Sequence, residues 1–166
     1  MNEQNTSKNL MEAFAGESAA RMKYTAYAQK AEAEGKPNTA KLFRVAADAE
    51  KIHAIKEFGL AGKIGLTADN LKDSIGGETH EFTEMYPSFL KDAETEGNKS
   101  AATAFRYAMK AEEVHAKLYN EALENVDSDE DEEVFYYLCP VCGNIEKYRP
   151  GRCSICGVSG DMFIKY

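Results

Sequence analysis

The chain has 166 residues, enough for one full hydrophobic core and a small second module. Its 28 acidic residues outnumber its 20 basic ones, and a formal net charge of −8 without a basic patch argues against a nucleic-acid partner. No apolar stretch approaches the roughly 18 residues of a membrane span, and the first residues lack the apolar core of a signal peptide, so we expect a soluble, cytoplasmic protein with no membrane partner.

Two helices are predicted in the first part of the chain. Apolar residues recur at three- and four-residue steps from about residue 5 to residue 34, where Gly35 would end the helix with a left-handed cap. Asn38 is a plausible N-cap for a second helix, which runs to about Gly59. The pattern therefore predicts an antiparallel helix pair.

A long connection and a second helix pair are predicted next. Residues 59–77 contain five glycines, which suits a crossover link between two helix pairs, within one subunit or exchanged with a neighbour. We expect the third helix over about 78–96 and the fourth over about 100–125. Pro87 lies inside the third helix and removes the backbone hydrogen bond of the Thr83 carbonyl, so a kink or bulge is expected beside Glu84.

An internal repeat joins the two helix pairs. Residues 34–54 and 96–116 agree at ten of 21 positions when they are aligned at an offset of 62. Both copies contain a Glu-x-x-His motif, Glu50 with His53 and Glu112 with His115. Residues three apart leave the same face of a helix, so each motif can present two metal ligands together.

Single glutamates upstream of each motif complete the pattern of a two-metal site. Glu17 precedes the first copy and Glu81 the second, which is the ligand pattern of di-iron or di-manganese carboxylate proteins with a four-helix bundle. Glu84 offers one further carboxylate, because the matching position after Glu17 is Ala20. Any one of these glutamates alone would be an ordinary surface residue, and the ligand types would also accept zinc or copper. Tyr24 shares a helix face with Glu17 and either hydrogen-bonds a ligand or fills the core.

A linker and a second domain are predicted at the end of the chain. Residues 127–133 form a run of acidic residues that no core would accept, and the aromatic and β-branched residues 134–137 favour a strand. All four cysteines follow, in two Cys-x-x-Cys-Gly motifs: Cys139, Cys142, Cys153 and Cys156. Four thiolates can hold a single iron or zinc, and a structural zinc ribbon is the alternative to a redox-active iron site.

These motifs resemble the rubrerythrin family over nearly the whole chain. The first helix contains Phe14-Ala15-Gly16-Glu17-Ser18-Ala19-Ala20-Arg21, and the third-helix motif is Gly77-Glu78-Thr79-His80-Glu81-Phe82-Thr83-Glu84-Met85-Tyr86-Pro87-Ser88-Phe89. The resemblance implies a mainly α fold: a ferritin-like four-helix bundle with one long crossover over residues 1–126, an acidic linker over 127–133 and a small rubredoxin-like domain over 134–166. It also implies a di-iron site whose ligands are Glu17, Glu50, Glu81, Glu112 and His115, with Glu50 and Glu112 bridging. Glu84 and His53 would be exchanged at one iron when the site is reduced. The four cysteines would hold a third iron.

The function implied by this resemblance is peroxide reduction. We expect a peroxidase that converts hydrogen peroxide to water in oxidative-stress defence, with electrons relayed through the four-cysteine iron from an external donor, a rubredoxin or an NAD(P)H-dependent reductase. The chain itself has no Gly-x-Gly-x-x-Gly motif for a nicotinamide. A homodimer or larger homo-oligomer is expected. The alternatives are an iron-handling ferroxidase of the ferritin-like class and a binding protein with zinc in its tail.

Overall fold

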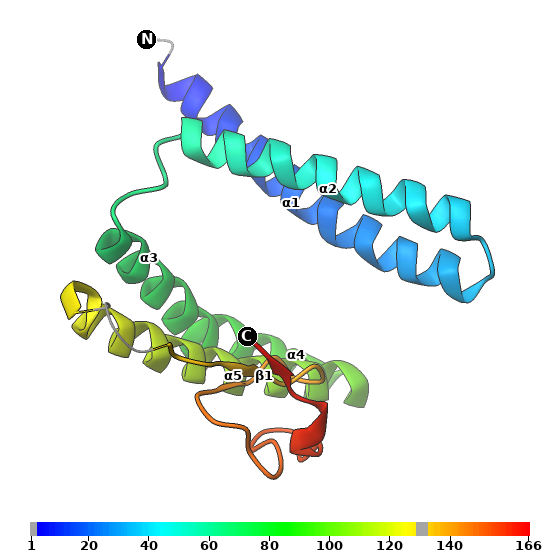
Figure 1. Ribbon diagram of the computed structural model, residues 1–166, viewed down its shortest axis with the longest axis vertical. Coiled ribbons are helices and arrows are strands. Elements are labelled where there is room, and N and C mark those ends of the chain that lie inside the picture. Colours follow the sequence, from blue (N-terminus) through cyan, green and yellow to red (C-terminus); the bar gives the residue numbers. More distant parts are fainter. Residues whose placement is uncertain (1–2, 129–132) are drawn as a thin grey trace. The chain divides into compact units, whose positions relative to one another are not determined.

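The computed structural model describes residues 3–128 and 133–166. It is mainly helical, with a small antiparallel sheet near the C-terminus, as the sequence predicts (Figure 1). The chain divides into two compact units, residues 1–65 and residues 66–166. The elements of the first unit are α1 (Glu3–Ala33) and α2 (Pro37–Leu60). Those of the second are α3 (Thr67–His80), the π-helical turn η1 (Glu81–Met85), α4 (Tyr86–Thr95), α5 (Lys99–Glu124), η2 (Val126–Ser128), β1 (Tyr137–Leu138), β2 (Ile145–Glu146), η3 (Gly160–Met162) and β3 (Ile164–Lys165).

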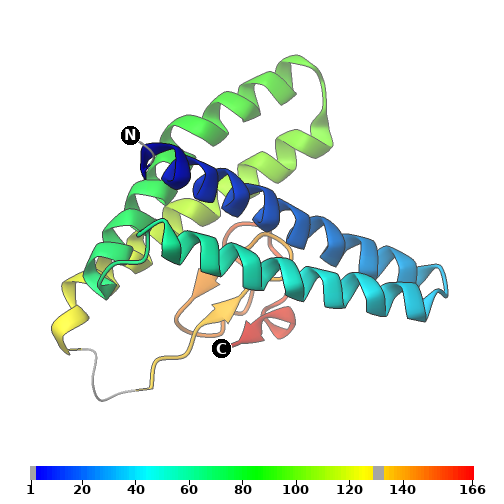
Figure 2. The same ribbon diagram turned by 90° about the horizontal axis from the view of Figure 1, so that it is seen from above.

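The first unit is a helical hairpin, visible in both views (Figures 1 and 2). Gly35 ends α1 at φ +71°, and the N–H of Lys36 bonds the carbonyl of Ala31 at 2.9 Å, which is the left-handed cap expected for this glycine. The N-cap prediction was wrong by two residues. Lys36 is the N-cap residue of α2, since Pro37 has the fixed φ and the missing N–H that suit the first helical position.

The repeat predicted from the sequence is visible in the geometry of both helix pairs. Gly97 between α4 and α5 has φ +72°, close to the +71° of Gly35. Arg44 binds Glu32 at 2.8 Å across the first hairpin, and Arg106 binds Glu94 at the same distance across the second. Arg106 and Glu94 each lie 62 residues after Arg44 and Glu32, which is the offset of the repeat. The two turns are therefore built alike.

The connection between the two helix pairs is shorter than the glycine pattern predicts. Helix α3 begins at Thr67 rather than near residue 78, so only residues 61–66 lie between α2 and α3. Residues 67–70, which have the composition of a turn, form the first turn of α3 instead. The long crossover predicted over 59–77 is therefore corrected to six residues.

The bulge expected from Pro87 is present. Residues 81–85 form a π-helical turn in which the N–H of Tyr86 bonds the carbonyl of Glu81. Pro87 then lies at the start of α4, directly after this turn. A π-bulge adds one residue to a helix and shifts the register of everything that follows it.

The C-terminal module is held by a three-stranded sheet in the order β2–β1–β3 and by the cysteine-rich loops. The strand predicted over 134–137 begins later, at Tyr137. Three of the cysteines and Phe163 form its buried core. The predicted acidic linker lies partly outside the described residues, which resume at Glu133.

Candidate metal centres

The first unit brings three of the predicted ligands together. Glu17 of α1 and Glu50 and His53 of α2 place one ligand atom each within 4.8 Å of one another. His53 Nδ1 lies 3.1 Å from Glu50 Oε2, while its side chain is 56% exposed. We call this group the first half-site.

Charge in the first half-site is incompletely balanced. The hydrogen bond that its carboxyl shares with Glu50 raises the pKa of Glu17, and partial burial and the charge of Glu57 act in the same direction. Glu57 Oε2 is itself buried and has no hydrogen-bond partner among the described residues. Carboxylate oxygens crowded together without enough donors fit a bound cation.

The second unit contains the matching group. Glu78 of α3 and Glu112 and His115 of α5 again lie within 4.8 Å of one another, and all three are half-buried. His115 Nδ1 lies 2.7 Å from Glu112 Oε2 and 3.9 Å from Glu78 Oε2. Burial and the charge of Glu112 raise the pKa of Glu78. This group is the second half-site.

Glu78, which is not among the predicted ligands, occupies the place we expect for Glu81. Burial, and then the charge of nearby Glu78, raise the pKa of Glu81, but Glu81 is not part of the group of three. The side chain of Glu84 is 74% exposed and lies 3.5 Å from His80. In the structure Glu78 therefore lies with Glu112 and His115, and the predicted ligand roles of Glu81 and Glu84 stay predictions.

The π-helical turn explains this shift. Beyond the turn, the two halves match at an offset of 62: the ring cluster of Tyr24, Tyr27 and Phe43 corresponds to that of Tyr86, Phe89 and Phe105. Before the turn, the offset is 61, because the bulge adds one residue, and Glu17 then corresponds to Glu78 and Ala20 to Glu81. The spacing to the Glu-x-x-His motif was the available signal: Glu17 precedes Glu50 by 33 residues, and Glu78 precedes Glu112 by 34.

Two tyrosines lie near the carboxylates of the second half-site. Burial and the charges of Glu112, Glu81 and Glu78 raise the pKa of Tyr86. Tyr119 has a raised pKa for the same kind of reason, with burial as the leading cause. Tyr24, the predicted neighbour of the first half-site, packs with its ring 6.3 Å from that of Tyr27 and 6.2 Å from that of Phe43. Its predicted hydrogen bond to a ligand stays a prediction.

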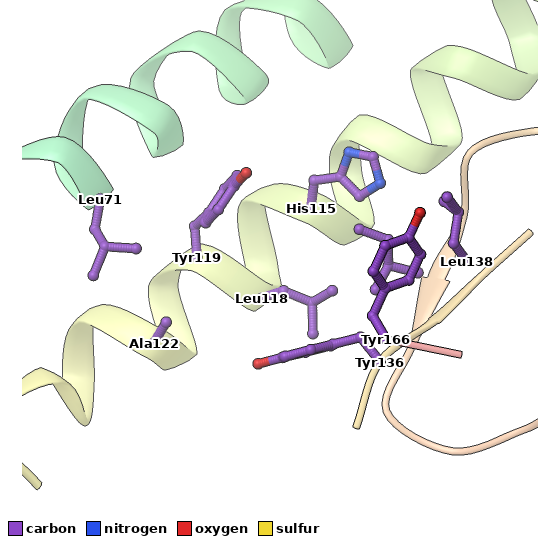
Figure 3. Close-up of a pocket in the computed structure, with 9 residues that line it drawn as sticks. Leu71, His115, Leu118, Tyr119, Ala122, Tyr136, Leu138 and Tyr166 are labelled. Carbon is purple, nitrogen blue, oxygen red and sulfur yellow. The ribbon is translucent and has the colours of Figure 1, made fainter. Parts of the chain in front are cut away.

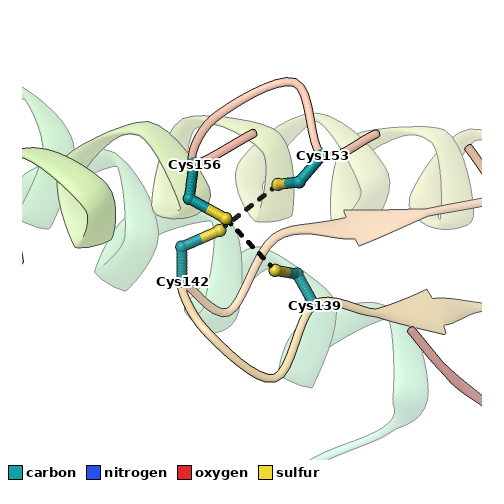
Figure 4. A group of neighbouring side chains, drawn as sticks. All are labelled: Cys139, Cys142, Cys153 and Cys156. Atoms are coloured by element: carbon teal, nitrogen blue, oxygen red, sulfur yellow. Dashed lines mark hydrogen bonds between the residues drawn. The ribbon is translucent and has the colours of Figure 1, made fainter. Parts of the chain in front are cut away.

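The four cysteines point toward one common centre (Figure 4). Cys139 Sγ lies 3.6 Å from Cys156 Sγ, and Cys142 Sγ lies 3.5 Å from Cys153 Sγ. Four sulfurs at about 2.3 Å from one tetrahedral metal would be about 3.8 Å apart, so the donor set fits such an ion. Gly143 and Gly157 have φ of +79° and +76°, which allows the chain to turn back sharply after each cysteine pair.

Backbone amides prepare one of these thiols for metal binding. Burial alone would raise the pKa of Cys153, but the N–H groups of Cys156 and Ile155 donate to its sulfur and lower the pKa to about 7. Burial raises the pKa of Cys142 and of Cys156. One thiol with a pKa near neutrality beside two whose pKa values are raised favours a bound cation that stabilises the thiolate form.

His115 connects the second half-site to the four-cysteine module. Its Nδ1 faces the carboxylates, and its Nε2 lies 2.9 Å from the carbonyl oxygen of Gly143, the residue that follows Cys142. A metal-binding histidine commonly donates its other N–H to a carbonyl in this way, which fixes the tautomer and the ring orientation. The module is also bound to α5 by an ion pair between Lys147 and Glu121.

An apolar cavity of about 440 Å³ lies beside His115 in the second unit. Leu118, Tyr119 and Ala122 line it from α5, and Tyr136 and Tyr166 line it from the C-terminal module (Figure 3). The cavity therefore brings a mostly apolar surface up to the histidine that links the two metal groups.

Paired helices with carboxylate and histidine half-sites, followed by a four-thiolate module, define a class of non-haem metalloprotein with two kinds of metal centre. The rubrerythrin family model matches residues 8–123. The chain is 37% identical to rubrerythrin-2 of Clostridium acetobutylicum, covering 95% of both chains, and 36% identical to nigerythrin of Nitratidesulfovibrio vulgaris, covering 97% of this chain and 86% of that one. A solved structure of nigerythrin in the fully reduced, all-ferrous state matches with a TM-score of 0.58 at 35% identity, over 97% of this chain and 86% of that one.

The chain therefore belongs to the rubrerythrin family, whose members are non-haem di-iron proteins, in general oxidoreductases, of oxidative-stress defence. Within the part of the chain that the structure describes, none of the helices has the length and apolar character needed to cross a membrane.

Proposed function

We propose that the protein is a peroxidase that reduces hydrogen peroxide to water, with electrons relayed through its four-cysteine module. The overall reaction takes up two electrons and two protons per peroxide and releases two water molecules. The observation that carries the proposal is the position of His115, which contacts Glu112 through Nδ1 and the carbonyl of Gly143 through Nε2. A single side chain thus joins the two groups of candidate metal ligands.

The residues that would hold the metals come from both half-sites and from the cysteine loops. Two irons bound by the half-sites would supply the two electrons and the open positions for peroxide, and a third iron on the four thiolates would pass electrons to them. The proposed ligands of the two irons are Glu17, Glu50, His53, Glu78, Glu81, Glu112 and His115, and those of the third are Cys139, Cys142, Cys153 and Cys156.

Glu81 takes the part that the resemblance assigns to Glu84. It is the carboxylate without a counterpart in the first half, since Ala20 occupies the matching position, and it lies beside Glu78. An anionic carboxylate favours the ferric state and a neutral imidazole suits the ferrous state, so Glu81 and His53 form the proposed exchange pair.

A tyrosine beside the second half-site can also take part in the reaction. Burial, and then the charges of Glu112, Glu81 and Glu78, raise the pKa of Tyr86, so its hydroxyl keeps its proton above the usual range. Tyr86 would donate a hydrogen bond to a substrate bound at this half-site.

An external protein must supply the electrons. A rubredoxin or an NAD(P)H-dependent reductase is the proposed donor, and the four-cysteine module is where it would act. Four clustered cysteines that would hold a metal as thiolates suit a reducing compartment, so the proposed location is the cytoplasm.

Anaerobic stopped-flow absorbance tests the proposal. The iron-loaded protein is fully reduced and mixed separately with hydrogen peroxide and with O2, while the bands of both kinds of iron centre are followed. We expect peroxide to reoxidise both centres far faster than O2 does. Glu84→Gln serves as a control, because Glu84 is exposed and outside the half-sites. Faster reaction with O2, or a four-cysteine centre without a redox-active band, would instead favour the ferroxidase or the structural-zinc alternative.

A further inference from the structure

The connection between the two helix pairs is too short for one chain to build a ferritin-like site by itself. Six residues, 61–66, separate Leu60 at the end of α2 from Thr67 at the start of α3. The first of them still belong to the helix cap: Gly62 has φ +69°, and the N–H of Lys63 bonds the carbonyl of Phe58 at 3.2 Å. Only the stretch from Lys63 onward can extend.

The distance that this connection would have to cover follows from the positions of the ligands. Glu50 lies ten residues before the end of α2, or about 15 Å along the helix axis, and Glu78 lies eleven residues after the start of α3, or about 16 Å. In a ferritin-like bundle the second and third helices run in the same direction, which is why a crossover joins them. If Glu50 and Glu78 lie at the same height along the bundle, the end of α2 and the start of α3 lie at opposite ends of it. The connection between them must then span the sum of the two lengths, about 31 Å. Seven fully extended Cα steps reach about 25 Å at most.

The first unit also has an apolar face without a partner. Leu42, Val45 and Ile52 of α2 are exposed by 68%, 62% and 66%. The repeat matches Val45 with Tyr107 of α5, which packs against the four-cysteine core. By contrast, the buried residues of the hairpin are all alanines: Ala28, Ala31, Ala40, Ala47 and Ala54. A two-helix hairpin with so small a core and such an exposed face requires a further surface to pack against.

We propose that this surface is a second copy of the same chain, and that the α1–α2 hairpin of one copy completes the metal site with α3, α4 and α5 of the other. The exchange is reciprocal, so a two-fold symmetric dimer contains two equivalent sites. Each site then takes Glu17, Glu50 and His53 from one copy, and Glu78, Glu112 and His115 from its partner. The inference rests on the di-iron site of the proposed function, but not on its reaction with peroxide.

Complementation between two inactive variants tests the exchange. One variant carries Glu50→Ala and His53→Ala, and the other carries Glu112→Ala and His115→Ala. They are given different affinity tags, co-expressed, and the mixed dimer is purified through both tags. With exchange, the intact hairpin of the second variant meets the intact α3, α4 and α5 of the first, so one of the two sites is complete and the other has both halves broken. The mixed dimer should therefore bind half of the bundle iron of the wild-type dimer. Each variant alone should bind none. Iron is measured by elemental analysis, after subtraction of the four-cysteine iron present in all samples.

Without exchange, each copy in the mixed dimer has one broken half, and no bundle iron returns. That result would overturn the proposal, as would a wild-type protein that is monomeric with its full iron content. The outcome is separable from the failure of the proposed function: a mixed dimer that regains iron but does not react with peroxide supports the exchange and rejects the peroxidase.

Lengthening the connection gives an independent test. A flexible Gly/Ser segment of about 20 residues inserted after Ile64 brings the connection to about 26 residues, whose average span of about 25–30 Å matches the distance that one chain must cover. We expect dilute samples to shift from dimer to monomer with bundle iron retained, as measured by sedimentation. The same segment added after Tyr166 is the matched control and should leave the dimer intact. A lengthened protein that stays dimeric to the same extent as this control would contradict the role of the short connection.

Discussion

The two half-sites contain the same Glu-x-x-His motif, yet their histidines lie in different surroundings. The side chain of His53 is 56% exposed, and its recorded partner is Glu50. The side chain of His115 is 17% exposed, and it contacts Glu112 on one ring nitrogen and the Gly143 carbonyl on the other. The difference shows that the C-terminal module gives one histidine a second contact that the motif by itself does not supply.

The largest expected effect comes from removing each histidine in turn. His53→Ala and His115→Ala each delete one candidate ligand, so both should weaken iron binding. Only His115→Ala also removes the contact with the module, and it should slow electron transfer from the four-cysteine iron to the bundle by about 10–100-fold. Stopped-flow reduction through an electron-donor protein, compared with reduction by dithionite, separates the two effects. Equal slowing in both variants would show that the module contact plays no special role.

Glycine substitutions in the two cysteine loops sharpen the comparison further. Gly143→Ala and Gly157→Ala each place a side chain at a positive φ, with no atom within 4 Å of the new Cβ, so backbone strain of about 1–2 kcal/mol is the expected cost in both. Denaturant titration of the visible band of the four-cysteine iron measures this loss. Only Gly143→Ala should also alter the spectrum of the bundle irons, because only Gly143 contacts His115.

The pH dependence of the metal-free protein should also differ between the half-sites. Burial raises the pKa of Glu78 above its ordinary value near 4.5, so the ionised carboxylate destabilises the folded state. The contribution of Glu78 to stability is therefore fully present below about pH 4.5 and is lost as the pH rises from there through the folded pKa of Glu78. Glu78→Gln should flatten this dependence and raise the melting temperature at neutral pH.

Glu17→Gln is the matched variant in the first half-site and should have a smaller effect, because the leading cause of its raised pKa is a hydrogen bond to Glu50 rather than burial. Thermal melts of the chelator-treated proteins from pH 4 to 8 provide the measurement. A larger shift for Glu17→Gln than for Glu78→Gln would reverse the predicted order.

The smallest effect is expected at the ion pair that also binds the module to α5. Lys147 and Glu121 are both substantially exposed, and such pairs contribute about 0.2–1 kcal/mol. Lys147→Ala should lower the free energy of unfolding of the second unit by no more than this, and a double-mutant cycle with Glu121→Ala isolates the pair. A cost well above that range would mean that this pair, and not His115, is the main attachment of the module.

Much of this architecture is predictable from the sequence because it depends on local chemistry. The Glu-x-x-His motifs, the cysteine spacing and the left-handed glycine at residue 35 each specify their own geometry. Pro87 likewise predicts a distortion at the right place, since a missing N–H must disturb the helix before it.

The errors arise where a local pattern leaves the register open. The sequence shows that a bulge is expected but not that it adds a residue, so the spacing alone does not show that Glu78 lies with Glu112 and His115. The start of α3 was missed because residues 67–70 have turn-forming side chains, although they form the first turn of a helix. The pair Glu78 and Glu81 and the pair Glu81 and Glu84 have the same three-residue spacing, so both fit one face of a helix. Only the positions of Glu112 and His115 on the facing helix distinguish the two pairs.

The π-helical turn has a consequence in evolutionary terms. If the two halves arose by duplication of one helix pair, the original product had two identical ligand sets. Insertion of a single codon between Glu78 and Tyr86 is then enough to rotate the later part of the helix relative to the earlier part. With glutamate rather than alanine at position 81, this gives the second half a carboxylate that the first half lacks. A symmetric ancestor could only bind two metals alike, whereas its descendant can treat one metal differently from the other.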